Sequence, residues 1–307
     1  MHAIWINTLG HPDTGQGAGE MFAVGSSGVV LRRSPGAAGT WSRVASGLTS
    51  RMLTAVWGLP GGDVYAAGDG GAFLYRADFN AAFSSASFTS TPLWGVYASD
   101  ESHLFAVGDG GVIWFNDAGG FPGHPPTQSW RQLAGDKPTT AFLNSVDGNG
   151  ASDVYAVGTG GAVIHKSGDA WRREAVGLTT VELNSVLAVS ENEVYAFGDE
   201  GTILTRRNGI WSREGAGVTT NRLLASFADA TTVYAVGEGG TWLEKPRGAS
   251  GLYWHLVSHP LPDAAFLAMA GNESEVWAVG YECTALRKSG SGFTVETIPG
   301  CDGENLT

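Results

Sequence analysis

Seven copies of a four-residue pattern run along this chain: an aromatic residue, Ala, an apolar residue and Gly. The copies occupy residues 22–25, 65–68, 105–108, 155–158, 195–198, 234–237 and 277–280, so their glycines are 43, 40, 50, 40, 39 and 43 residues apart. A strand-like unit that returns about every 40 residues is typical of a β-propeller, in which each repeat forms one blade of a ring.

The repeats use the whole chain of 307 residues and leave no segment long enough for a second domain. We predict a single all-β domain, a seven-bladed β-propeller of four-stranded antiparallel blades. Glycine is abundant, at 46 residues, and its regular spacing assigns it to turns rather than to disorder. The predicted blades cover approximately residues 1–51, 52–91, 92–141, 142–181, 182–221, 222–264 and 265–307.

Each repeat holds four strand-sized pieces, named A to D here from the channel outward. Strand A is a five-residue core such as 53–57, and strand B holds the repeated pattern. A glycine-rich hairpin turn joins strands B and C. Innermost strands crowd around a narrow channel, which explains why the third residue of strand A is always small. These residues are Ala3, Ala55, Gly95, Ser145, Ser185, Ala225 and Ala268.

Strand D carries one aromatic residue in each copy, and we expect these rings to pack between neighbouring blades. They are Trp41, Phe88, Trp130, Trp171, Trp211, Trp254 and Phe293. Arginines follow strand C, as at Arg33, Arg76 and Arg206, or flank the strand D rings, as at Arg43 and Arg173. We expect both groups to be solvated charges at the outer edge, where they discourage pairing with other chains.

The order of the pattern, a glycine turn, a short apolar strand and then Asp or Asn before Trp resembles the sialidase-type (Asp-box) propellers. It is most similar to the bacterial repeats that resemble photosystem II assembly factors. A shortened Asp-box stands at 167–171, with remnants at 39–41 and 208–211. The resemblance covers nearly the whole chain and implies the fold. We do not expect sialidase activity, because that activity needs an arginine cluster for the substrate carboxylate and the arginines of this chain fall mainly away from the channel mouth.

The B–C turns and the D–A connections between blades should share one face, which is the face where propellers usually bind ligands. The turns place acidic and hydroxyl side chains on this face. A shallow surface of this kind could bind a cation, a cationic partner or sugar hydroxyls. The alternative is that Asp-Gly and Glu-Gly are simply favoured turn sequences. The candidate residues are Asp69, Asp109, Thr159, Asp199, Glu238 and Tyr281.

The second residue of strand A enters from the same face. Trp94, Asn144 and Asn184 hold this position in successive blades and resemble a carbohydrate subsite, with a ring for stacking and amides for hydroxyl contacts. The alternative is that they pack one blade on the next with satisfied amides.

Composition excludes several functions. A formal charge of −12 argues against nucleic acid, which needs clustered Lys and Arg. No apolar run is long enough to span a bilayer, so we expect no membrane insertion. The seven histidines are scattered, and we expect no metal site and no cofactor beyond weak surface calcium.

Both cysteines fall in the last repeat, Cys283 in its B–C turn and Cys301 just after its strand D. We expect them on one face within bridging reach, so a disulfide is predicted. A disulfide favours an oxidising compartment, hence a secreted, periplasmic or cell-surface protein. The alternative is a pair of free thiols.

We therefore expect a bacterial binding module without catalytic activity, recognising a glycan in lectin-like fashion or a protein on the B–C face. The first alternative is a scaffold or assembly factor that binds a partner protein. The second is a glycoside hydrolase or lyase whose carboxylates come from several blades. The oligomeric state is left open.

The disulfide gives the first testable prediction. Titration of the unfolded, unreduced protein with a thiol reagent should find no free thiol, and prior reduction should expose two. Two titratable thiols before reduction would remove the argument for an oxidising compartment.

Overall fold

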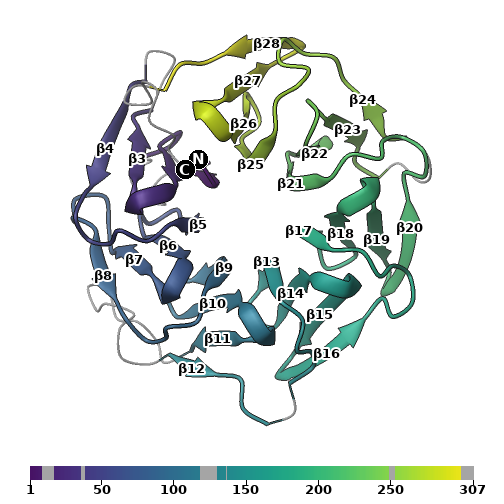
Figure 1. The fold of residues 1–307 in the computed structure, drawn as a ribbon, viewed down its shortest axis with the longest axis horizontal. Coiled ribbons are helices and arrows are strands. Elements are labelled where there is room, and N and C mark those ends of the chain that lie inside the picture. The colour runs from purple at the N-terminus through teal and green to yellow at the C-terminus, as the bar shows by residue number, and fades with distance from the viewer. Residues whose placement is uncertain (9–16, 36–38, 118–129, 136, 249–252, 299–307) are drawn as a thin grey trace.

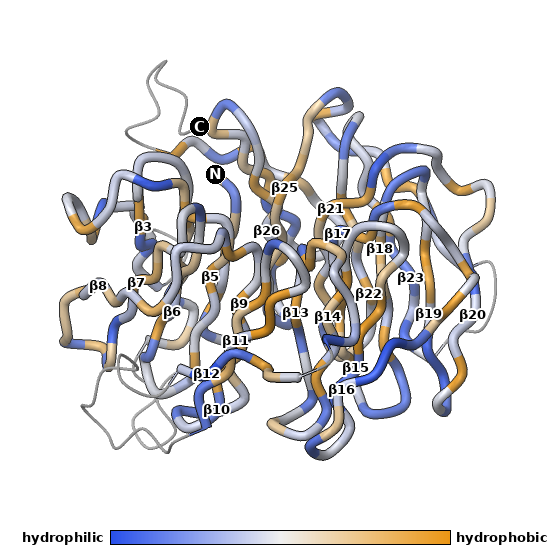
Figure 2. Tube along the Cα trace, turned by 60° about the horizontal axis from the view of Figure 1, so that its bottom comes forward, coloured by the Kyte–Doolittle hydropathy of each residue, from blue (hydrophilic) through white to orange (hydrophobic). Residues whose placement is uncertain are grey.

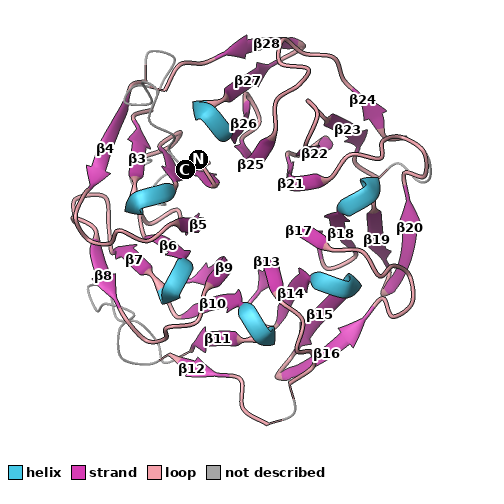
Figure 3. Ribbon diagram, viewed as in Figure 1, coloured by secondary structure: helices cyan, strands magenta, loops and turns pink. Residues whose placement is uncertain are grey.

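The computed structural model describes residues 1–8, 17–35, 39–117, 130–135, 137–248 and 253–298. These residues form seven four-stranded antiparallel sheets arranged as a ring around a central channel (Figure 1). The described part of the chain has no α-helix, and six short 3-10 turns surround the channel (Figure 3). It also has no helix long and apolar enough to cross a membrane. The predicted fold class is confirmed.

Strand order in each sheet follows the chain from the channel outward. The A strands are β1 (Ala3–Ile6), β5 (Leu53–Gly58), β9 (Leu93–Asp100), β13 (Leu143–Gly150), β17 (Leu183–Ser190), β21 (Leu223–Ala228) and β25 (Phe266–Gly271). The B strands are β2 (Met21–Val24), β6 (Val64–Gly68), β10 (His103–Gly108), β14 (Asp153–Gly158), β18 (Glu193–Gly198), β22 (Thr232–Gly237) and β26 (Val276–Gly280).

The outer half of each sheet has the same regularity. The C strands are β3 (Val30–Arg33), β7 (Phe73–Arg76), β11 (Ile113–Asn116), β15 (Ala162–Ser167), β19 (Ile203–Arg207), β23 (Trp242–Pro246) and β27 (Ala285–Ser289). The D strands are β4 (Trp41–Ala45), β8 (Ser84–Ala86), β12 (Arg131–Gln132), β16 (Ala170–Glu174), β20 (Ile210–Glu214), β24 (His255–Leu256) and β28 (Gly292–Val295). Hydrophobic residues concentrate along the strands (Figure 2).

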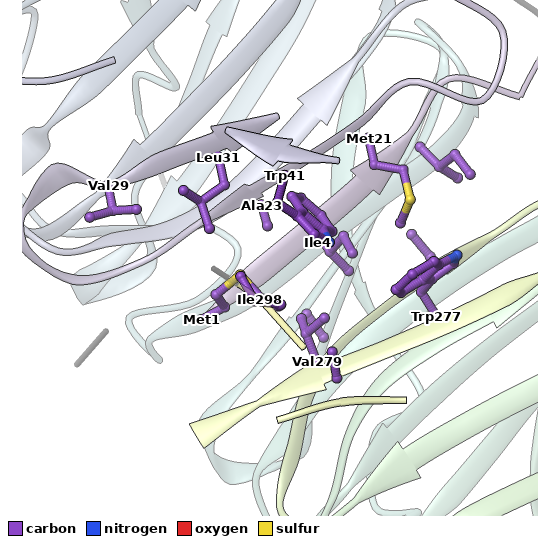
Figure 4. Close-up of a cluster of buried hydrophobic side chains, with 14 residues drawn as sticks. Met1, Ile4, Met21, Ala23, Val29, Leu31, Trp41, Trp277, Val279 and Ile298 are labelled. Carbon is purple, nitrogen blue, oxygen red and sulfur yellow. The ribbon is translucent and has the colours of Figure 1, made fainter. Parts of the chain in front are cut away.

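Every sheet consists of four consecutive strands, so side-chain packing rather than a shared strand closes the ring between the first and last blades. Ile4 and Trp41 of the first blade lie in one buried cluster with Trp277 and Val279 of the last (Figure 4). The indole rings of Trp41 and Trp277 meet edge to face, with centroids 6.4 Å apart. An aromatic pair of this kind adds to the stabilisation from buried area.

The B–C turns pack directly on the D–A connections, which places both on one face, called the upper face below. In the turn Thr159–Gly161, a Cβ atom on Gly161 would lie 2.3 Å from the carbonyl oxygen of Thr179. Gly161 also has a positive φ of 66°, so both space and backbone conformation require glycine here.

A second steric rule governs the lower half of the channel. At three places the fifth side chain of one strand A lies over a glycine at the sixth position of the next strand A. A Cβ atom on Gly58 would lie 2.7 Å from the ring of Trp5, and one on Gly148 would lie 2.9 Å from that of Tyr97. Large residues therefore fit against small ones around the channel.

The cations of strand C overturn the expectation of edge charges. Arg33 and Arg76 are each only 4% exposed, and Lys245 is fully buried. Each of five such cations lies over the strand B aromatic ring of the preceding blade, where the ring face attracts it. The distances to the ring centroids are 4.9 Å for Arg33 on Trp277, 4.5 Å for Arg76 on Phe22, 5.6 Å for Arg206 on Tyr155, 5.4 Å for Lys245 on Tyr195 and 5.6 Å for Lys288 on Tyr234. The arginines beside the strand D rings, such as Arg173, are exposed as expected.

The strand D rings pack between blades as predicted. Trp211 lies 6.3 Å from Tyr155 of the preceding blade, and Trp254 lies 6.0 Å from Tyr195. Phe88 packs on the next blade instead, stacked on Trp130 with ring centroids 4.3 Å apart. Phe83, just before β8, is buried and lies 5.9 Å from Phe22, the strand B ring of the first blade.

Ion pairs reinforce four of the contacts between blades. Glu20, which is fully buried, accepts hydrogen bonds from Arg32 of its own blade and from Arg76 of the next, the latter at 2.9 Å. The other three pairs also join a carboxylate of one blade to a strand C cation of the next. They are Glu174 with Arg206, Glu214 with Lys245 and Glu244 with Lys288.

The buried cations give the second prediction. Arg76→Met should lower the free energy of unfolding by about 3–5 kcal/mol, because it leaves the buried Glu20 carboxylate without one of its two cations. Arg173→Met, on an exposed edge strand, should change it by less than about 0.5 kcal/mol. Urea unfolding of both variants measures the difference, and equal effects would restore the view that both residues are solvated edge charges.

Candidate functional site

The A strands enclose a channel cavity of about 560 Å³. Its upper part is lined by the second residue of each strand A, including Trp94, Asn144 and Asn184. The remaining second residues are His2, Thr54, Leu224 and Leu267, all of them partly exposed. The structure therefore brings the three predicted subsite residues together on adjacent inner strands at the channel mouth.

Three of the polar second residues, Thr54, Asn144 and Asn184, tie their blade to the next. Thr54 donates to the carbonyl oxygen of Leu93 at 2.7 Å. Asn144 donates to Glu182 Oε1 at 2.8 Å and to the carbonyl oxygen of Leu183 at 3.0 Å. Both N–H groups of that amide are thus used inside the protein, which leaves only its oxygen for a ligand.

The next blade repeats this arrangement with a turn carboxylate. Asn184 donates to Asp199 Oδ1 at 2.9 Å and to the carbonyl oxygen of Leu223 at 3.0 Å. Trp94 donates from its indole nitrogen to Asp109 Oδ1 at 2.6 Å, within a single blade. The turn residues and the second residues of strand A, identified separately in the sequence, therefore form one hydrogen-bonded rim.

Two arginines at the rim were not identified from the sequence. Arg222 bridges Asp199 at 2.8 Å and Glu238 at 3.4 Å, and its pKa is raised chiefly by the hydrogen bond to Asp199. Arg51 lies 3.9 Å from Asp69. Both arginines lie in D–A connections, one or two residues before a strand A begins. Their position in these connections is the sequence feature that could have placed them at the rim.

The remaining predicted residues have different surroundings. Thr159 Oγ1 accepts a hydrogen bond from the backbone N–H of Phe142 at 3.0 Å. Tyr281 is 50% exposed and its ring meets His2 edge to face at 6.3 Å. Phe142 is also 50% exposed, and it stands immediately before strand A, at a position where the residue type varies from blade to blade.

Deeper in the channel, Asp147 occupies a position that holds an aromatic ring in four other blades. Its Oδ1 accepts from the backbone N–H of Gly148 at 2.9 Å, and its Oδ2 accepts from that of Ala188 at 2.8 Å. Burial raises the pKa of this carboxyl to about 7, against the opposing effect of the two hydrogen bonds.

The described residues contain no group of three or more His, Cys, Asp or Glu side chains placed to hold a metal ion. Cys301 lies outside the described residues, so the disulfide between Cys283 and Cys301 stays a prediction.

No protein-family model matches this sequence, and no curated protein sequence matches it. Solved structures share its fold at low identity. A structure of YCF48 bound to D1 peptide is 15% identical, with 80% of this chain and 82% of that chain covered and a TM-score of 0.62. The WD40 β-propeller domain of Doa1 is 9% identical, with coverages of 96% and 90% and a TM-score of 0.69. Virginiamycin B lyase from Staphylococcus aureus is 10% identical, with coverages of 80% and 84% and a TM-score of 0.66. At these identities the likeness establishes a β-propeller and nothing more specific.

The raised pKa of Asp147 gives the third prediction. Because the folded-state pKa is about 7 and the ordinary value is 3.8, the proton favours folding below pH 4, and this contribution is lost as the pH rises to 7. Asp147→Leu copies Leu187 of the next blade and should remove the loss. The free energy of unfolding of the wild type, measured with urea, should therefore fall by roughly 2–4 kcal/mol more than that of the variant between pH 4.5 and 8. Parallel pH profiles would contradict a raised pKa.

Proposed function

We propose that this protein is a binding module without catalytic activity and that it takes an extended segment of a partner protein at the upper channel mouth. One observation carries the proposal: exposed aromatic side chains and carboxylates surround the opening of a concave cavity. Phe142 and Tyr281 are each 50% exposed at this rim. Large exposed rings beside a cavity are typical of protein recognition sites.

The lining beneath the rim fits a peptide better than a sugar. Leu224 and Leu267 offer partly exposed apolar surface, which suits aliphatic side chains. The amide donors of Asn144 and Asn184 are already used within the protein. A glycan hydroxyl would find acceptors here but few free donors. Among the structural neighbours, the YCF48 structure with D1 peptide is an example of a propeller that holds a peptide.

Several further properties belong to the same proposal. We place the protein among the sialidase-type (Asp-box) repeat propellers, exported by a bacterium and stabilised by the disulfide between Cys283 and Cys301. The role would then be that of a scaffold or assembly factor. The lyase among the structural neighbours makes lyase activity the competing function, and the rim carboxylates would have to supply its catalysis.

The fourth prediction concerns the two exposed rings. Peptides are first selected from a random display library on the immobilised protein. They should bind the double variant Phe142→Ser/Tyr281→Ser about tenfold or more weakly than the wild type, because exposed aromatic anchors dominate such interfaces. Fluorescence polarisation measures the change. The control is Ile210→Ser, an equally apolar residue that is 73% exposed at the outer edge of the fifth blade. A library that yields no binding peptide, or peptides sensitive only to the control, would overturn the proposal.

A further inference from the structure

The carboxylates of the upper rim differ in whether the protein itself neutralises them. Arg51 faces Asp69, while Arg222 serves both Asp199 and Glu238. Among the described residues, which include every Lys and Arg of the chain, none forms an ion pair with the side chain of Asp109 or Glu182. These two carboxylates therefore keep their negative charge, as do Glu200 and Glu282 in two other B–C turns of the same face, which also form no ion pair with a described residue.

Neutral donors hold these two carboxylates. The Trp94 indole binds Asp109, and the Asn144 amide binds Glu182. Such donors orient a carboxylate and leave its charge in place, and each carboxylate keeps further lone pairs for another donor. The nearby Lys137 donates to the carbonyl oxygen of Gly110 at 3.4 Å rather than to the Asp109 side chain. Arg222 acts on Glu182 only through a weaker, longer-range attraction.

Two aromatic residues belong to the same part of the rim: Trp94 holds Asp109, and Phe142 stands two residues before Asn144, which holds Glu182. Trp94 lies on β9 and Phe142 directly precedes β13, and these inner strands are neighbours in the ring (Figure 1). Thr159 anchors the backbone of Phe142 while half of that residue remains exposed. Indole and phenyl faces attract cations, and they also accept apolar side chains. We call Trp94, Asp109, Phe142, Asn144 and Glu182 the open sector.

We infer that the partner segment presents a Lys or Arg side chain to the open sector, with an apolar residue beside it. The inference rests on the proposed function and adds the chemical class of the ligand. The cation would bind Asp109 or Glu182 while its stem and the neighbouring apolar residue pack on Trp94 and Phe142. The chain's formal charge of −12 would add long-range attraction for such a segment.

The fifth prediction concerns the peptides that the library selection yields. Their sequences should be enriched in Lys or Arg next to aromatic or aliphatic residues, and replacing the basic residue by Ser should weaken binding by about tenfold. Binding should weaken as salt is raised from 50 to 300 mM, because salt screens exposed charges.

A double variant ties the effect to the open sector. Asp109→Asn/Glu182→Gln keeps an oxygen for each neutral donor and removes both charges, so it should weaken binding of the basic peptide about tenfold while leaving the Ser peptide unchanged. The matched control, Asp169→Asn/Glu191→Gln, removes the same charges from exposed residues in turns of the opposite face. Circular dichroism and urea unfolding verify that each variant is folded.

The outcomes separate the two proposals. Selected peptides that lack basic residues, but need Phe142 and Tyr281, would leave the proposed function standing and overturn the inference. Equal losses in the two double variants would show that general charge rather than the open sector attracts the peptide, which also overturns it. Selection of no peptide would overturn the proposed function itself.

Discussion

The fold depends on how each blade packs on the next one, because a ring of separate sheets has no shared strand to hold it together. The clearest example is Lys245, whose ammonium lies 5.4 Å from the ring of Tyr195 in the preceding blade and 5.6 Å from that of Trp254 in its own. It also pairs with Glu214 of the preceding blade. A buried ammonium is tolerated only when it is paired and surrounded in this way. The same arrangement recurs around the ring, so the contacts between blades set their spacing and thereby the width of the channel.

The repeat made the blade count and the strand order predictable, since glycine and aromatic spacing reflect local geometry. The role of the strand C cations was not predictable, because charge alone does not show whether a residue faces solvent or a neighbouring blade. Phe83 was missed for a related reason: the second blade has a longer C–D connection, which shifts the ring relative to the repeat. Gly58 and Gly148 looked like ordinary turn or strand residues, and only the rings packed over them show why they are glycine.

The candidate site was predictable in part. Position within the repeat placed Trp94, Asn144 and Asn184 beside one another, and it placed Asp109 and Asp199 above them. The position of a residue within its repeat does not show which side chain of another blade it pairs with. Arg222 neutralises two predicted acids, and no spacing rule links its place in a connection to carboxylates in two different turns. Whether a rim carboxylate is paired with a cation therefore depends on the three-dimensional arrangement and cannot be predicted from repeat position.

Departures from the repeat that carry a structural cost point to the same face as the unmatched charge. The middle residue of the B–C turn has a positive φ, and Gly70, Gly110 and Gly160 satisfy it without strain. Ser27, Glu200 and Glu282 adopt φ values of 56°, 56° and 50° at the same position, which costs roughly 1–2 kcal/mol each relative to glycine. Stability alone would favour glycine in all these turns. Two of the three residues that bear this cost are acidic and lie on the face that carries Asp109 and Glu182, which fits attraction for a basic partner.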